Sequence, residues 1–342
     1  MNLSEMPRVR MACLPTPLEE MKALSEFLGG PRLLIKRDDM TGLAFGGNKV
    51  RKLEFIMADA LRKGAKTIIT SGGVQTNWGR LAVAAAVRFG MKPVLVLTGE
   101  EPASYRGNLC LDYLMDAELH FVDVDPNLDG KTHMKALREA GEAKVAELEE
   151  TYRAKGLAPY VIPRGGRTTQ GTAGYLTATI EILQQLTDRG IKADYILTGT
   201  GTTSTTGALL MGQRVFGTGI KTIGISVSRP AEECRERIQE QIEKDMAFFG
   251  WKEKIDRDEI VVFDDSIGPG YAVPSAEGVE AIKLLAAKEA VILDQNYTGK
   301  AMAGLIGLIR RGYFKKSETV IFLHAGGVPA LFALEDRYFR GR

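Results

Sequence analysis

The sequence predicts an α/β protein with open parallel sheets flanked by helices. Short apolar runs rich in β-branched residues alternate with longer amphipathic stretches, the pattern of strands that are buried on both faces. Several of these runs end in glycine-rich turns, and 38 of the 342 residues are glycine, about 11% against a usual ~7%. No internal repeat or low-complexity linker interrupts the alternation. A length of 342 residues suggests about two domains, although composition marks no boundary.

Nine runs are predicted to form strands. In chain order they are Leu33–Lys36, Thr67–Thr70, Pro93–Leu97, Leu119–Val122, Tyr160–Ile162, Tyr195–Leu197, Thr222–Val227, Ile260–Phe263 and Thr319–Leu323. Seven amphipathic stretches between them are predicted to form helices. These are Lys52–Lys63, Thr76–Phe89, Lys131–Lys155, Gly171–Asp188, Gly207–Phe216, Ala231–Phe249 and Ala276–Lys288. Because strand and helix alternate so regularly, we expect the strands to run parallel.

Composition and charge exclude several classes of protein. Lys and Arg number 45 against 43 Asp and Glu, so the net charge of +2 gives no support to a nucleic-acid surface. No stretch approaches the ~18 apolar residues of a membrane span, and the N-terminus lacks a signal-peptide pattern, so we expect a cytoplasmic protein. Three cysteines and three histidines are scattered, which predicts neither a disulfide framework nor a metal site.

Glycine-rich turns follow four of the predicted strands. They are Ser71-Gly72-Gly73, Arg164-Gly165-Gly166, Thr198-Gly199-Thr200-Gly201 and His324-Ala325-Gly326-Gly327. In open α/β sheets ligands bind beyond the carboxyl ends of the strands. The sequence therefore predicts a bound small molecule at these turns.

The turn Thr198–Gly207 has the composition of a phosphate site. Its glycines let the backbone curl, and its N–H groups and hydroxyls could hold a phosphate at the start of a helix. It lacks the dinucleotide fingerprint, because Ser204 occupies the third glycine position and no acidic residue follows about 20 residues later. The alternative is a threonine-rich turn that only caps a helix.

Three further segments carry candidate chemistry. In Gly46-Gly47-Asn48-Lys49 the lysine could form a Schiff base, with Arg51 and Lys52 as nearby cations, or the segment could simply start a helix with solvated basic residues. In Gly73–Trp78 the residues Thr76 and Asn77 could bind a carboxylate or only cap a helix. Tyr297 could be an acid/base or a core residue with a polar tip.

Taken together, these segments resemble one family closely. Besides the turns above, the resemblance is carried by Lys36-Arg37-Asp38-Asp39, Arg51-Lys52-Leu53-Glu54, Gln75-Thr76-Asn77, Gly268-Pro-Gly-Tyr271 and Tyr297-Thr298-Gly-Lys300. Their order and spacing resemble the D-cysteine desulfhydrase and 1-aminocyclopropane-1-carboxylate deaminase family of pyridoxal-phosphate enzymes, which includes cysteate sulfo-lyases. The resemblance implies the two-domain tryptophan-synthase-β fold (fold type II), usually as a homodimer. Residues 1–52 and 165–342 would form the large, cofactor-binding domain and residues 53–164 the small one.

The resemblance also assigns roles to residues, and pyridoxal 5′-phosphate is the cofactor that it implies. Lys49 would form the Schiff base, Asn77 would bond the pyridoxal 3′-oxygen, and Thr298 would face the pyridine nitrogen. The phosphate would be held by Lys52 together with the turn residues Thr200, Gly201, Thr202, Thr203, Ser204 and Thr205. The substrate side would be formed by Gln75, Thr76, Asn77, Trp78, Tyr271 and Tyr297. Two departures from the family stand out. Thr76 replaces a usual serine beside Trp78, which replaces a polar residue, commonly histidine, and the turn Gly201–Thr206 replaces one that is richer in glycine.

The reaction that this resemblance implies is β-elimination from a small β-substituted amino acid. A D-cysteine desulfhydrase would release sulfide, with pyruvate and ammonia formed from the remaining aminoacrylate. The alternatives are a cysteate sulfo-lyase, which would release sulfite, and a 1-aminocyclopropane-1-carboxylate deaminase. Thr298 speaks against the deaminase, since that branch carries glutamate there to keep the pyridine nitrogen protonated. A small-ligand-binding protein without catalytic activity is the alternative outside this class.

Overall fold

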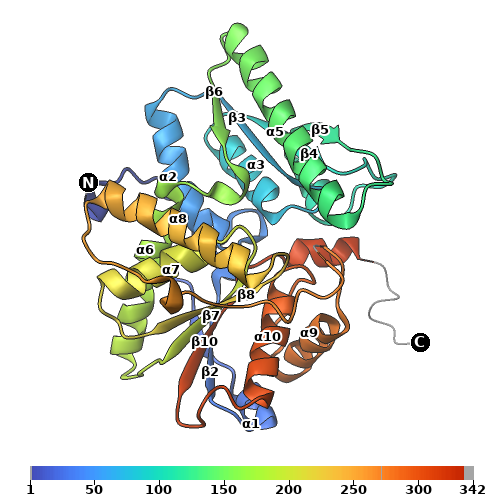
Figure 1. Ribbon diagram of the computed structural model, residues 1–342. Coiled ribbons are helices and arrows are strands. Elements are labelled where there is room, and N and C mark those ends of the chain that lie inside the picture. The colour runs from blue at the N-terminus through green and yellow to red at the C-terminus, as the bar shows by residue number, and fades with distance from the viewer. Residues whose placement is uncertain (1, 271, 335–342) are drawn as a thin grey trace.

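The computed structural model describes residues 2–270 and 272–334, and these residues form two sheets, each covered by helices (Figure 1). The larger sheet contains six strands in the spatial order β1-β2-β10-β7-β8-β9. Their bounds are β1 Leu18–Glu20, β2 Arg32–Lys36, β7 Tyr195–Thr200, β8 Lys221–Ser226, β9 Val261–Phe263 and β10 Thr319–Leu323. All neighbouring pairs are parallel except β1 with β2. The carboxyl ends of the five parallel strands therefore meet at one edge.

Helices cover both faces of the six-stranded sheet. Successive strand residues point to opposite faces, so Leu33 and Ile35 pack on one side and Leu34 on the other. The first face is covered by α1 (Lys22–Leu28), α9 (Ala276–Glu289) and α10 (Thr298–Arg310). The second face is covered by α6 (Thr169–Asp188) and α7 (Ser204–Val215). Burial on both faces explains why these strands are continuous apolar runs.

The smaller sheet contains four parallel strands in the order β5-β4-β3-β6. Their bounds are β3 Thr67–Gly73, β4 Lys92–Thr98, β5 Glu118–Val122 and β6 Pro159–Ile162. One face packs on α5 (Gly130–Ala154) through Ile69, and the other packs on α3 (Asn77–Arg88) through Ile68. In Figure 1 this sheet and its helices form the upper lobe, above the six-stranded sheet.

Three further helices complete the set. They are α2 (Lys49–Arg62), α4 (Gly107–Leu114) and α8 (Ala231–Phe249). Short 3₁₀ turns connect several elements, and one of them, at Arg164–Gly166, follows β6. The helix α2 packs on α6, beside the larger sheet, and also on α3 of the smaller one.

The structure confirms the α/β class, and each of the nine predicted strands and seven predicted helices overlaps an observed element. Four elements were not predicted: β1, α1, α4 and α10. The four strands of the smaller sheet lie between residues 67 and 162, whereas all other strands lie outside that range. The domain boundaries at 52/53 and 164/165 stay predictions, and α2 runs across the first of them.

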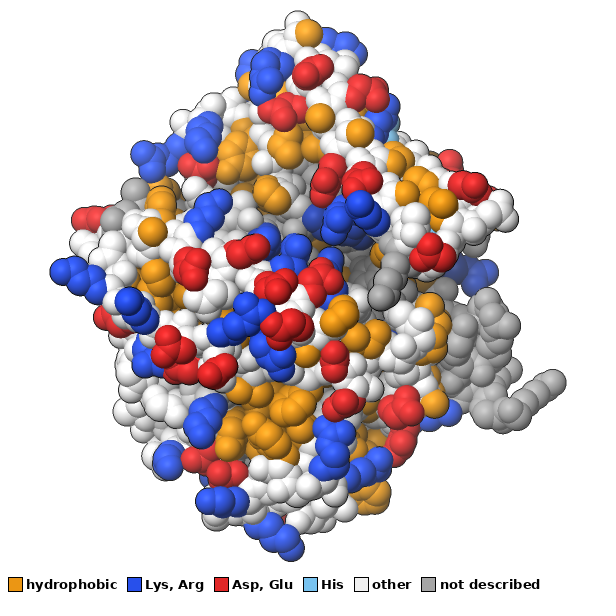
Figure 2. Space-filling model, viewed as in Figure 1, with side chains coloured by type: hydrophobic (Ala, Val, Ile, Leu, Met, Phe, Trp, Pro, Cys, Tyr) orange, Lys and Arg blue, Asp and Glu red, His pale blue; other side chains and the backbone are white. Residues whose placement is uncertain are grey.

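On the face shown in Figure 2, Lys and Arg side chains are interspersed with Asp and Glu side chains. Apolar side chains gather in the lower part of this face, between groups of charged residues. Among the described residues, no helix combines the length and the apolarity that a membrane crossing requires.

Candidate active site

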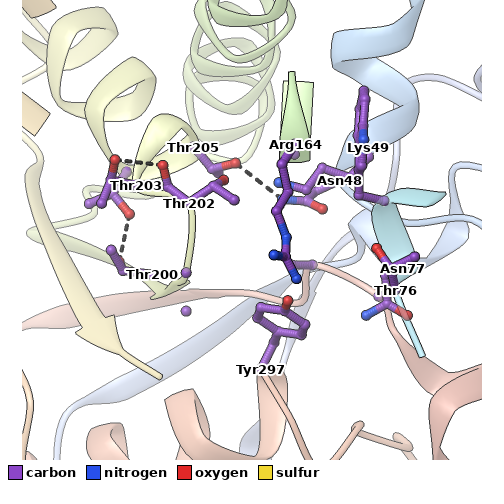
Figure 3. Close-up of a pocket in the computed structure, with 17 residues that line it drawn as sticks. Asn48, Lys49, Thr76, Asn77, Arg164, Thr200, Thr202, Thr203, Thr205 and Tyr297 are labelled. Atoms are coloured by element: carbon purple, nitrogen blue, oxygen red, sulfur yellow. Dashed lines mark hydrogen bonds between the residues drawn. The ribbon is translucent and has the colours of Figure 1, made fainter. Parts of the chain in front are cut away.

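A cavity of about 660 Å³, counting the part open to solvent, lies where carboxyl ends of strands from both sheets meet (Figure 3). The lining residues come from six segments: the start of α2 and the residues that end or follow β3, β6, β7 and β10, together with Tyr297. They include Asn48, Lys49, Thr76, Asn77, Trp78, Arg164, Thr200, Gly201, Thr202, Thr203, Thr205, Tyr297 and Gly326. Three of the four glycine-rich turns line the cavity, and the fourth, Ser71-Gly72-Gly73, does not, although residues 76–78 just after it do.

Lys49 is the first residue of α2 and lines this cavity. Among the described residues, its amine has no hydrogen-bond or ion-pair partner. Burial lowers the pKa of Lys49 to about 8, because a desolvated ammonium is disfavoured. At pH 7 roughly one amine in ten is then neutral, about 300-fold more than at an ordinary lysine pKa near 10.5. Such an amine is suited to nucleophilic attack on a carbonyl.

The backbone that precedes Lys49 needs its glycines. Gly46 and Gly47 have φ values of 66° and 135°, which glycine adopts most readily. After β10 the chain passes directly over this turn, and a Cβ at Gly326 would lie 2.7 Å from Gly47 Cα. Asn48 N–H donates to Ala325 O at 2.9 Å, which fixes the start of α2 against the end of β10.

Lys52 lies one helical turn after Lys49 and is fully buried. Its ammonium Nζ donates to Ser204 Oγ at 2.6 Å, and Ser204 is the first residue of α7. Burial, and secondarily the charge of Lys49, lowers the pKa of Lys52 well below its ordinary value. A buried ammonium and the free N–H groups of a helix start both attract an anion. The idea that these basic residues are merely solvated is wrong for Lys52 and for Arg51, which is 1% exposed.

The turn before α7 places several hydroxyls around the cavity. Thr203 has a left-handed backbone with φ of 68°, which curls the chain just before the helix. Thr200 and Thr206 share a hydrogen bond of 2.7 Å between their hydroxyls, and Asn48 Nδ2 donates to Thr205 Oγ1 at 3.1 Å. The threonines of this turn line the cavity, whereas Lys52 and Ser204 lie behind the lining. The turn and the α7 N-terminus form a cradle that fits a phosphate, and the Lys52 ammonium lies next to it.

Asn77 is held by a chain of polar contacts that the sequence did not reveal. Asn108 Nδ2 donates to Asn77 Oδ1 at 2.8 Å, and Arg80 Nη1 donates to Asn108 Oδ1 at 2.8 Å. Arg80 Nη2 also donates to Gly46 O at 2.7 Å, which connects this network to the Lys49 turn. The contact with Asn108 fixes which way the Asn77 amide points. Its Nδ2 group is then available to donate to a ligand.

The residues on either side of Asn77 have structural contacts of their own. Thr76 Oγ1 accepts from Gly79 N–H and caps α3, as the alternative reading of this turn expected. Gln75 Nε2 donates to Arg106 O, and its Oε1 accepts from Asn108 N–H. The Trp78 indole is 4% exposed and donates to Thr70 Oγ1 at 2.8 Å, within the core of the smaller lobe.

Tyr297 and Thr298 stand at the start of α10. Tyr297 lines the cavity, and its ring packs against Gly201, where a Cβ would lie 2.9 Å from Tyr297 Cε1. Thr298 is buried, lies outside the cavity lining, and donates its hydroxyl to Asp294 Oδ1 at 2.6 Å. The Asp294 carboxylate also accepts the N–H groups of residues 296, 297 and 298. Tyr271, the other predicted tyrosine, lies outside the described residues.

Arg164 is a lining residue whose role the sequence reasoning missed. It was noticed only as the start of a glycine-rich turn, because an arginine after a strand carries no local signal of its target. Figure 3 shows its side chain reaching into the cavity toward Tyr297.

Comparison with known proteins accounts for this arrangement. The family model described as "Pyridoxal-phosphate dependent enzyme" matches residues 9–326. The chain belongs to this family of pyridoxal-phosphate-dependent enzymes. It is also similar to a crystal structure described as that of an "ACC deaminase homologue", with 34% sequence identity and a TM-score of 0.86. The match covers 98% of this chain and 96% of that one. Together they support fold type II and pyridoxal phosphate as the cofactor.

The cavity fits this cofactor on structural grounds. Lys49 supplies an amine suited to the aldehyde, and Lys52 supplies a buried ammonium that lacks a carboxylate in direct contact among the described residues. The hydroxyl-rich turn and the α7 N-terminus fit the phosphate, and Asn77 Nδ2 is available for an oxygen on the ring. The specific role of each residue stays a prediction.

Proposed function

We propose that this enzyme is a carbon–sulfur lyase, similar to D-cysteine desulfhydrase, that performs β-elimination on a small β-substituted amino acid. The products would be pyruvate, ammonia and sulfide. The observation that carries the proposal is Lys49, a cavity-lining amine with a pKa of about 8 and no partner among the described residues. We further propose a cytoplasmic homodimer, on the resemblance alone.

The protein side chains would bind the substrate and transfer its protons. When bound, the cofactor serves as an electron sink for the α-carbon. The neutral amine of Lys49 would act as a base and take the α-proton of the substrate. The Tyr297 hydroxyl would protonate or position the leaving group. The substrate carboxylate would bind at the N-terminus of α3, near Thr76 and Asn77.

Ring opening of 1-aminocyclopropane-1-carboxylate is a less favourable reaction for this site. Thr298 places a hydroxyl rather than a carboxylate at the position predicted to face the pyridine nitrogen. Its proton is already donated to Asp294. A hydroxyl cannot stabilise a protonated ring as a carboxylate does, and β-elimination with a good leaving group tolerates the weaker sink. We therefore expect little ring-opening activity compared with β-elimination.

The proposal is tested in two steps with the purified protein. It should be yellow, and borohydride should abolish the visible band and fix the label on Lys49, while a Lys49→Ala variant takes no label. Lys63→Ala changes an exposed lysine that directly follows the same helix and is the matched control. Keto-acid release is then assayed on a panel of amino acids that includes both enantiomers of cysteine. A colourless protein, or a yellow one that releases no keto acid from any of them, contradicts the proposal.

A further inference from the structure

Arg164 differs from the other arginines near the cavity. Among the described residues, its guanidinium has no hydrogen-bond or ion-pair partner, although it reaches into the cavity (Figure 3). Arg167, three residues later, donates to Arg237 O at 2.6 Å and pairs with Glu240. Arg229 donates to Gly201 O and pairs with Glu233. The five N–H donors of Arg164 therefore have no protein acceptor among the described residues and are available to a ligand in the cavity.

The backbone around Arg164 makes this placement a fixed property of the turn. Arg164 directly follows Pro163 at the end of β6, and Gly165 and Gly166 have φ values of 74° and 64°. A Cβ at Gly165 would lie 2.5 Å from Thr202, and one at Gly166 would lie 2.8 Å from the Trp78 ring. Close packing on both glycines holds the turn against the phosphate cradle and the small-lobe core.

The charges around the cavity leave Arg164 without an anionic partner. Lys49 and Arg164 are the two charged lining residues, and both are cationic. In the proposed enzyme Lys49 would serve the cofactor aldehyde and then the α-proton of the substrate. The phosphate would be bound by Lys52 and the start of α7, and the substrate's α-carboxylate by the start of α3. Arg164 would then remain without an anion, and among the described residues no carboxylate lines the cavity to neutralise it.

We propose that Arg164 binds an anionic group on the β-carbon of the substrate, which rests on the proposed function and names its substrate class. The class is amino acids whose leaving group is a tetrahedral oxyanion: a sulfonate, a sulfate ester or a phosphate ester. A guanidinium donates two parallel hydrogen bonds to such a group, and its charge is always present. The β-elimination and its products pyruvate and ammonia stay as proposed, but the preferred leaving group becomes sulfite, sulfate or phosphate in place of the sulfide of a thiol substrate.

For a β-sulfonate the reaction balances without any oxidant or reductant. The α-carbon loses its proton and the β-carbon–sulfur bond breaks, with the electron pair leaving on sulfite. The remaining three-carbon enamine takes up one water molecule and gives pyruvate and ammonia. Arg164 stabilises the charge that grows on the leaving oxyanion as the bond breaks.

The experiment compares the wild-type enzyme with Arg164→Gln and with Arg167→Gln as the matched control. The substrates are cysteate, serine O-sulfate and O-phosphoserine, against cysteine and 3-chloroalanine, each as both enantiomers. We expect wild type to favour at least one of the anionic substrates. Arg164→Gln should lower kcat/KM for that substrate about 10- to 100-fold, the usual effect of losing a charged hydrogen-bond partner. It should change 3-chloroalanine turnover less than about threefold, and Arg167→Gln should change neither.

A second measurement does not depend on turnover. Calorimetry on the cofactor-loaded enzyme gives the Kd of 3-sulfopropanoate, which lacks the amino group, and of butanoate, which also lacks the second charge. The sulfonate should bind at least about tenfold more tightly, and Arg164→Gln should abolish the difference. Sulfonate binding through Arg164 without turnover of any amino acid would refute the proposed function and leave the anion site standing.

Other outcomes would overturn the proposal about Arg164. A loss of cofactor affinity in Arg164→Gln, seen in the visible spectrum, would assign the guanidinium to the cofactor phosphate. An equal loss of kcat/KM on all substrates would assign it to the α-carboxylate. Equal binding of 3-sulfopropanoate and butanoate by the wild-type enzyme would show that no second anion is recognised.

Discussion

Two lysines one helical turn apart in α2 have very different surroundings. Lys49 faces the cavity without a partner among the described residues, whereas Lys52 is fully enclosed and donates to Ser204. Burial lowers the pKa of both, but only the Lys49 amine can reach a ligand carbonyl in the cavity. The first amine is suited to react and the second to attract an anion.

The pKa of Lys49 predicts how cofactor uptake depends on pH. Only the neutral amine attacks an aldehyde, and with a pKa of about 8 its fraction rises about tenfold per pH unit below 8 and then levels. The rate at which the visible band returns when cofactor is added to stripped protein should follow this curve between pH 6 and 9.5. A rate that keeps rising past pH 10 would show that Lys49 has an ordinary pKa.

Replacing Lys52 by methionine should have opposite effects on the stripped and the loaded protein. Removing a buried ammonium that has no carboxylate in contact should raise the melting temperature of the stripped protein. The loss of the phosphate's cationic partner should weaken cofactor retention about tenfold or more. Melting curves and dialysis against buffer measure the two effects. If the substitution raises both the melting temperature and the cofactor retention, or lowers both, this role for Lys52 is contradicted.

Tyr297→Phe should lower the turnover number about 10²- to 10⁴-fold, the usual contribution of a general acid or base. The visible band and the melting temperature should stay unchanged, because the ring that packs against Gly201 is retained. The assay uses the best substrate from the panel. An unaltered turnover number would leave Tyr297 with a packing role only.

At the scale of elements, the start of α10 depends on one carboxylate. Asp294 accepts three backbone N–H groups and the Thr298 hydroxyl, all at 2.6 to 2.9 Å. This acceptor orders the turn that presents Tyr297 to the cavity. We therefore treat Asp294 as a positioning residue for α10.

Asp294→Ala should destabilise the protein by about 2–4 kcal/mol, since several buried donors lose an ionised acceptor. It should also lower turnover, because Tyr297 loses its fixed backbone. Asp294→Asn keeps an acceptor oxygen and should recover part of both losses. Chemical denaturation and steady-state kinetics measure them. A stable Asp294→Ala variant with normal turnover would refute this positioning role.

An element could be predicted from the sequence where its apolar residues form a clear helical or strand pattern. Strands that are buried on both faces were found because their apolar runs are continuous. β1 was missed because it is a three-residue edge strand, Leu-Glu-Glu, with a single apolar residue. α10 was missed because three glycines and an almost uniformly apolar surface hide its helical period, and it is buried nearly all round.

The site likewise contains residues that a local sequence motif reveals and residues whose role depends on the fold. Turns next to Lys49 and Thr203 carry glycine and hydroxyl patterns that can be recognised in the sequence. Arg164 reaches the cavity and Asn108 reaches Asn77 from separate segments, and their roles depend on which strand ends become neighbours. Trp78 was assigned to the substrate side, and it both lines the cavity and donates its indole N–H to Thr70 in the small-lobe core. No local pattern reveals this contact with Thr70.

At the scale of the whole molecule, a buried ionic network connects segments that are far apart in sequence. Arg51 of α2 pairs with Asp38 and with Glu181 of α6, both at 2.8 Å, and Lys36 of β2 also pairs with Glu181 at 2.5 Å. Tyr175 donates to Asp38 at 2.6 Å. The network therefore fixes α2, which carries both lysines, to the larger sheet and to the helix above it.

This network predicts a specific loss of stability in acid. Burial alone would raise the pKa of Asp38, but the charges of Arg51 and Lys36, with hydrogen bonds from Arg51 and Tyr175, lower it overall. A lowered pKa gives stability that is present above the unfolded value of about 4 and is lost as the pH falls below it. Asp38→Asn should lower the free energy of unfolding at pH 7 by about 3–5 kcal/mol, since Arg51 loses a buried partner.

In Asp38→Asn, the fall in stability below pH 4 should be shallower than in wild type. Denaturation curves at several pH values give both numbers, and Asp265→Asn, an exposed surface pair with Arg311, serves as the control. If Asp38→Asn loses stability below pH 4 as steeply as wild type, this account of the network is wrong.

The position of β10 has a consequence for how the protein is made. β10 lies between β2 and β7 in the larger sheet, yet it is the last strand along the described chain, and about 280 residues separate it from β2. At about 5–20 residues per second, β2 leaves the ribosome roughly 15 to 60 s before its parallel partner exists. During synthesis the β1–β2 hairpin therefore has an open edge, which chaperones can cover. The turn that carries Lys49 obtains its backing from Ala325 and Gly326 only after residue 326 has been translated, so we expect the nascent chain to bind its cofactor no earlier than that.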